Sequence, residues 1–244
     1  MSSIALKYPK TGQGGTGEHP PVKDGGGGDR GGSGSPNYGA RLRRARLGLA
    51  VGLTSVTMLF VSFTSAYIVR QGLPTLDEHT QTYVRDWISV NLPLTLLLVN
   101  TLLLLVSSIT VELARRQITR QAALAPVKSI PGVSVGDERG FPWLNITIVL
   151  GFGFLFGQWM AWRELADRGF YLATSTSGAF FYVLTGAHAI HLVGGLIALL
   201  VSAITALMRR PVESRRIVVD VTAWYWHFMA VLWIYIFGLL WFAR

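Results

Sequence analysis

The chain has 244 residues, of which half are hydrophobic and only 14% are charged, and its mean hydropathy is +0.40. Soluble globular domains carry about 25% charged residues, so this composition excludes an ordinary cytosolic protein. The lack of cysteine excludes disulfides, thiolate metal sites and iron–sulfur clusters. The formal net charge is +9, but the arginines cluster at the ends of apolar blocks. That placement favours lipid head groups over nucleic acid as the negatively charged partner.

Residues 1–40 differ from the rest of the chain. They contain 12 of the 27 glycines, four prolines and no long apolar run. Such a segment buries too little apolar surface to offset the entropy lost on ordering. We therefore predict a disordered, glycine-rich cytoplasmic tail at 1–40, followed by a single membrane domain at 41–244.

Five apolar blocks follow the tail, and each is long enough to cross a hydrocarbon core of about 30 Å as a helix. They are continuously apolar, without the alternation that marks the strands of a membrane β-barrel. The sequence therefore predicts an all-α, polytopic membrane helix bundle with five transmembrane helices. The predicted spans are about 47–69, 89–111, 142–162, 178–208 and 221–243.

The positive charges between the spans are unequally divided, with 13 Lys and Arg flanking one side and five flanking the other. The richer side should be cytoplasmic. This places the N-terminus inside and the C-terminus outside. The richer side carries Arg41, Arg43, Arg44, Arg46, Arg115, Arg116, Arg120, Lys128, Arg139, Arg209, Arg210, Arg215 and Arg216.

The predicted spans contain no Asp, Glu, Lys or Arg, which weighs against a pump, an ion-coupled transporter or a voltage sensor. They do contain His188, His191 and His227. One reading is a haem-b membrane anchor that passes electrons to or from quinone through His188 and His227. The other is hydrogen bonding between helices. We favour hydrogen bonding, because we find no second histidine pair and expect no acidic partner to orient a metal-bound ring.

Small and polar residues mark faces on which membrane helices can approach closely. Asn100 and Ser107 lie seven residues apart on one helix face, with Ser108 beside Ser107. Glycines recur in the third and fourth spans, at Gly151, Gly153, Gly157, Gly186, Gly194 and Gly195. The favoured interpretation is packing within one bundle, with binding of a second membrane subunit as the alternative.

Several segments, in order, resemble subunit III of the haem–copper respiratory oxidases (the cytochrome c oxidase family). The stretch LLLVNTLLLLVSSIT at 96–110 resembles that family's Asn-Thr and Ser-Ser helix. FFYVLTGAHAIH at 180–191 resembles its Gly-x-His-x-x-His signature, and YWHFMAVLW at 225–233 resembles its Trp-His-Phe segment. Gln158 and Glu164 have the family's spacing, and SAYIVR at 65–70 resembles the end of its first retained helix.

The resemblance implies the five-helix form of this subunit, in a bacterial cytoplasmic membrane. It implies an accessory, non-catalytic subunit of a proton-pumping terminal oxidase that reduces O2 to water. The chain itself would have no catalytic, cofactor or metal site, and the haems and copper would belong to partner subunits. Its partners would be subunit I, the other oxidase subunits and phospholipid. The residues expected to hold the bundle, lipid or subunit contacts are Asn100, Ser107, Ser108, Gly153, Gly157, Gln158, Glu164, Gly186, His188, His191, Trp226, His227 and Trp233.

Three positions depart from the family pattern. Carboxylates that the family usually carries align here with Val56, Ala161 and Ala230. Apolar side chains suit a bundle embedded in lipid, so the departures leave the expected fold intact. This chain therefore lacks the acids on which a proton-delivery role of that kind would depend.

Overall fold

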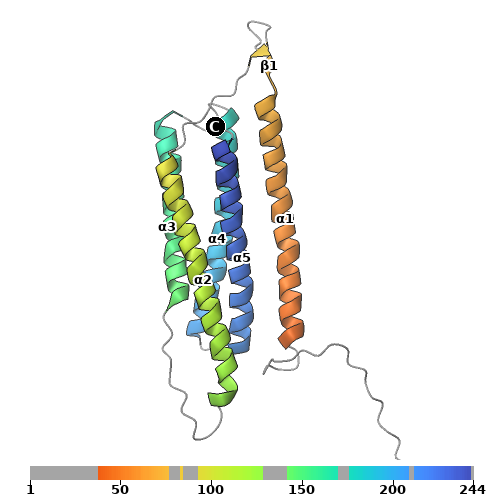
Figure 1. Cartoon of the computed structure of the whole chain (residues 1–244), viewed down its shortest axis with the longest axis vertical. Helices are drawn as coiled ribbons and strands as arrows, with labels where there is room; N and C mark the ends of the chain where they lie inside the picture. Colours follow the sequence, from red (N-terminus) through yellow and green to blue (C-terminus); the bar gives the residue numbers. More distant parts are fainter. Residues whose placement is uncertain are drawn as a thin grey trace, which may run out of the picture. The chain divides into compact units, whose positions relative to one another are not determined.

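The computed structural model describes residues 38–76, 83–84, 93–128, 142–169, 176–208 and 212–242. These residues form five long helices and one small hairpin (Figure 1). The helices are α1 (Tyr38–Gly72), α2 (Leu94–Lys128), α3 (Trp143–Asp167), α4 (Thr176–Leu207) and α5 (Val212–Phe242). All five are long and apolar enough to cross a membrane. The predicted all-α membrane bundle is confirmed.

Two-residue strands β1 (Thr75–Leu76) and β2 (Tyr83–Val84) form an antiparallel pair after α1. Thr75 pairs with Val84, and Leu76 pairs with Tyr83. The sequence analysis did not predict this hairpin. It lies between the first two helices, outside the apolar blocks, so it does not alter the bundle.

The helices extend beyond several of the predicted spans. Helix α2 continues 17 residues past position 111, and α5 begins nine residues before position 221. The extensions carry charged side chains, which an apolar window excludes although a helix can continue through them. Helix α1 begins at Tyr38, within the last residues of the predicted tail. The rest of the predicted 1–40 tail lies outside the described residues.

Helix α1 contacts α4 and α5 along one narrow stripe. Phe60, Thr64 and Tyr67 are its buried residues, at the i, i+4, i+7 spacing of one helix face. Other apolar side chains of α1 are exposed, including Leu47, Val51 and Met58. Five hydroxyl groups of α1 donate to backbone carbonyls four residues earlier, which satisfies them in an apolar setting.

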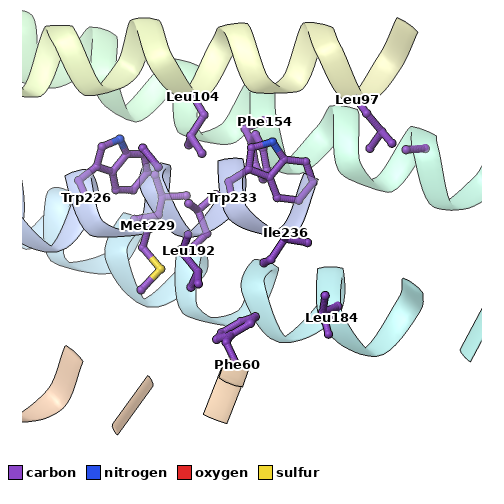
Figure 2. Close-up of a cluster of buried hydrophobic side chains, with 14 of the residues drawn as sticks. Phe60, Leu97, Leu104, Phe154, Leu184, Leu192, Trp226, Met229, Trp233 and Ile236 are labelled. Carbon is purple, nitrogen blue, oxygen red and sulfur yellow. The ribbon is translucent and has the colours of Figure 1, made fainter. Parts of the chain in front are cut away.

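The core lies mainly among α2, α3, α4 and α5, and Phe60 of α1 completes it (Figure 2). Its largest fully buried side chains are Trp226 and Trp233 of α5. The Phe154 ring of α3 packs edge-on against the Trp233 ring, with 4.9 Å between their centroids. Leu104 of α2 belongs to the same cluster. Aromatic pairs in this geometry contribute about 0.5–1.5 kcal/mol beyond the burial of their area.

Candidate functional site

Hydrogen bonds between side chains join α2 to α5 along the length of their interface. The indole Nε1 of Trp226 donates to Ser107 Oγ at 2.9 Å, and that of Trp233 donates to Thr101 Oγ1 at 3.0 Å. Both indoles are buried, so each N–H needs a partner inside the bundle. Ser107, Trp226 and Trp233 therefore take part in hydrogen bonds that join α2 to α5.

Charged residues gather at the end of the bundle where α1 and α5 begin. Asp220 of α5 accepts hydrogen bonds from Arg46 of α1 at 2.9 Å and from Arg115 of α2 at 3.1 Å. Glu112 pairs with Arg115 at 2.7 Å and with Arg116 at 2.9 Å. We call these five residues the ionic cluster. It connects three helices through Asp220, whose side chain is only 10% exposed.

His227 lies beside this cluster. Its Nδ1 is 2.5 Å from Ser108 Oγ, and its Nε2 is 3.5 Å from Glu112 Oε2. The expectation that no acidic residue accompanies the histidines is therefore wrong for His227. Glu112 lies one residue beyond the predicted second span, and the helix carries it on to face α5. The contact with Ser108 joins α2 to α5.

The two histidines of α4 face different neighbours. His188 is fully buried between the rings of Phe154 and Trp233, with centroid distances of 5.9 and 5.2 Å. Neither of its ring nitrogens has a hydrogen-bond partner among the described residues. His191 lies against Phe60 of α1, and its Nδ1 is 2.7 Å from the carbonyl oxygen of Ala187.

This arrangement does not favour a bis-histidine haem. His188 contacts Trp233, which lies six residues, or about 9 Å, along α5 from His227. Two axial ligands must point at one iron atom, whereas these rings contact different neighbours at different depths. Within the described ranges, no group of three or more His, Cys, Asp or Glu residues is placed to hold a metal ion.

The glycines divide into those that meet a neighbouring helix closely and those that do not. A Cβ atom on Gly157 would collide with the amide of Asn100 on α2. A Cβ on Gly151 would lie 2.9 Å from the Trp226 ring, and one on Gly195 would lie 2.8 Å from the Tyr225 ring. These three positions require glycine for close approach.

Two glycines chosen from the sequence do not share this close packing. A Cβ on Gly186 would meet no described atom within 4 Å, and one on Gly153 would make only an ordinary contact at 3.9 Å with Leu103. Of the Gly-x-x-x-Gly pair on α3, Gly157 lies at a tight contact and Gly153 does not. The sequence pattern could not say which of its glycines faces the tight contact.

The remaining predicted site residues lie on α3. Gln158 is 1% exposed, and its amide nitrogen and oxygen have no described hydrogen-bond partner. Glu164 is far more exposed and pairs with Arg168 at 2.5 Å, one turn along the same helix. Glu164 therefore pairs within its own helix, near the end of α3.

The three positions that lack the family's carboxylates all face the bundle. Ala161 and Ala230 are buried, at 0% and 4% exposure, and Val56 packs against the core from α1. A charged carboxylate at any of them would need a partner in apolar surroundings. Alanine and valine avoid that requirement.

Sequence reasoning missed Asp220 as a site residue, together with its partners Arg46 and Arg115. It used these arginines only as charges that set the orientation. A signal was present, because Asp220 is an acid directly before an apolar span at an end rich in arginine. Its partners are 105 and 174 residues away in the sequence, so their identity required the fold.

The fold and the site together define a multi-pass membrane protein whose buried polar groups mainly link one helix to the next. The family model "Cytochrome c oxidase subunit III" matches residues 38–243. The chain therefore belongs to the cytochrome c oxidase subunit III family, a family of the respiratory chain, and its five helices fit the five-helix form.

Individual relatives agree with this family. A "Probable cytochrome c oxidase subunit 3" of Mycobacterium tuberculosis is 34% identical over 110 residues, which are 45% of this chain and 54% of the relative. A protein of the same name from Nocardia farcinica is 33% identical over 110 residues, with the same coverage. The "Cytochrome c oxidase subunit 3" of Struthio camelus is 28% identical over 192 residues, which are 79% of this chain and 67% of the relative. The chain thus spans about half the length of the mycobacterial and nocardial relatives.

Proposed function

We propose that this chain is the accessory, non-catalytic subunit III of a proton-pumping haem–copper terminal oxidase that reduces O2 to water. The observation that carries the proposal is the family match across residues 38–243, together with the five apolar helices that the described residues form. In this proposal the haems and copper belong to partner subunits. The bacterial relatives support a place in a bacterial cytoplasmic membrane.

We further propose that the chain packs against the catalytic subunit, holds phospholipid between its helices and supports proton uptake. The exposed apolar side chains of α1, such as Val51, Met58 and Val61, suit contact with lipid or with another membrane subunit. Support of proton uptake would have to work without carboxylates at positions 56, 161 and 230, which carry Val56, Ala161 and Ala230. It would instead rely on the partner subunits and on lipid order.

Co-purification tests the assignment. The full chain, tagged and expressed in its native host, should purify with a haem-containing subunit and with oxidase activity. The chain isolated alone should show no Soret absorption band. A Soret band from the isolated chain would contradict the non-catalytic assignment and favour the haem-b alternative. Purification without any oxidase subunit would contradict membership of the complex.

The proposed orientation places the N-terminus in the cytoplasm, on the side with 13 flanking positive charges. A reporter enzyme that works only outside the membrane should be active when fused after residue 244. The same reporter should be inactive when inserted within 120–138. Activity at the second position, or inactivity at the first, would reverse the assignment.

A further inference from the structure

A pocket of about 500 Å³ lies between the ends of α2, α3, α4 and α5. Its walls are largely apolar, with Ile118, Leu144 and Leu207 among them. Polar side chains also line it, namely Gln117, Gln121, Asn145 and Arg215. The volume is within the range of about 300–1,000 Å³ that is usual for small-molecule sites.

Arg215 is the charged residue among the described residues that line this pocket. Its Nε atom is buried and has no hydrogen-bond partner among the described residues. Arg46 and Arg115 at the same end of the bundle are, by contrast, paired with Asp220. A buried guanidinium N–H without a partner is unfavourable, and its fork of donors matches phosphate oxygens. Among the described residues, the pocket thus presents a cation without an anionic partner.

The position of the pocket suits a lipid better than a free anion. It lies at the end of the bundle that the arginine count predicts to be cytoplasmic, where anionic head groups collect. Trp143 lines it, and tryptophan is typical of the membrane–water boundary. A free phosphate would leave Ile118 and Leu144 uncovered, whereas an alkyl chain would cover them.

We propose that this pocket binds one anionic phospholipid, with its phosphate on Arg215 and an alkyl chain along the apolar wall formed by α2 and α3. The proposal rests on the lipid-holding role proposed above, and it specifies where the lipid binds and which head group is selected. A zwitterionic choline head group fits less well, because it brings a positive charge towards Arg215.

Photocrosslinking tests the site on the full chain in lipid nanodiscs. The probes are phosphatidylglycerol and phosphatidylcholine, each with a photoreactive diazirine in one alkyl chain, and the labelled peptides are identified by mass spectrometry. Phosphatidylglycerol should label the segments around 114–121 and 142–145 about fivefold more than phosphatidylcholine, the factor expected for one basic residue near anionic lipid.

Substitutions test whether Arg215 is the residue that selects the anionic head group. Arg215→Gln should reduce phosphatidylglycerol labelling to the phosphatidylcholine level, and Arg215→Lys should keep most of it. Arg216→Gln removes the same charge from a neighbour that stacks on Tyr38 and does not line the pocket, so it should leave labelling unchanged. Equal losses in Arg215→Gln and Arg216→Gln would mean a diffuse surface charge and would overturn the proposal.

Two further outcomes would also overturn the proposed phospholipid site. Equal labelling by the two lipids would mean that the pocket selects no head group. Displacement of the phosphatidylglycerol label by millimolar inorganic phosphate would mean a free-anion site. If Arg215→Gln does not insert into the membrane, the comparison of the two lipids on the unmodified chain still tests whether the pocket selects an anionic head group. Co-purification of oxidase subunits is measured separately, so failure of the lipid site is distinguishable from failure of the oxidase assignment.

Discussion

Two glycines on helix α4 allow the tightness of the α4–α5 contact to be measured. An added Cβ on Gly195 would lie 2.8 Å from Tyr225 Cε1 and 3.2 Å from Trp226 Cε3. Neither ring is free to retreat. The Tyr225 hydroxyl donates to the carbonyl oxygen of His191 at 2.8 Å, and Trp226 is fully buried and bonded to α2. Gly186, nine residues earlier, has no described atom within 4 Å of an added Cβ.

The expected magnitude follows from comparing Gly195→Ala with Gly186→Ala. Overpacking a well-packed contact costs about 1–3 kcal/mol. Alanine is favoured over glycine within a helix by about 1 kcal/mol, and this gain is common to both variants. Their difference in free energy of unfolding should therefore equal the overpacking term, with Gly195→Ala less stable by about 1–3 kcal/mol.

The measurement is an SDS titration of each purified variant in mixed micelles, with helix content followed by circular dichroism. Gly186→Ala should unfold at or above the SDS fraction of the unmodified chain, and Gly195→Ala should unfold below it. If the two variants unfold together, the two aromatic rings can move aside and the contact is looser than the distances indicate.

Four other substitutions, one of them a control, test the ionic cluster, the histidine assignment and the departures from the family. Asp220→Asn should destabilise the bundle by about 2 kcal/mol in the same titration, because it weakens charge-assisted bonds to two helices. Glu164→Gln, which breaks an exposed pair within one helix, should cost less than about 1 kcal/mol, and equal effects would contradict the bridging role of Asp220. His227→Gln should cost about 1–2 kcal/mol and leave the haem content of the purified complex unchanged; loss of one haem would refute it. Val56→Glu should create a site for a hydrophobic carbodiimide where 47–69 now has no carboxyl group, and no labelling would mean that position 56 does not face the bundle.

Residue identity alone was enough to predict the membrane spans. A run of about 20 apolar residues can satisfy its backbone in lipid only as a helix, so five such runs imply five helices. The same reasoning did not place the ends of the helices accurately. Helices α2 and α5 continue into charged segments at Glu112 and Asp220, where hydropathy falls but the helix does not end.

The sequence also indicated which residue types would join the helices. Ser107, Ser108, Trp226 and His227 were predicted to hold the bundle, lipid or subunit contacts, and that role stays a prediction. In the structure these four residues form hydrogen bonds between α2 and α5. Their partners could not be read from the chain, because each pair is 119 residues apart. A resemblance to known family motifs identifies such residues without stating what each one touches.

Hydropathy by itself determined that this protein crosses a membrane and approximately where. Only the tertiary structure decided which face of each helix is buried, because α1 and α2 are apolar on nearly every side and their periodicity distinguishes no inner face. For that reason the sequence could not separate Gly195, which packs tightly, from Gly186, which does not. It likewise could not foresee that Asp220 joins α1 to α2, since that ion pairing arises when three helix ends, distant in sequence, are brought together by packing.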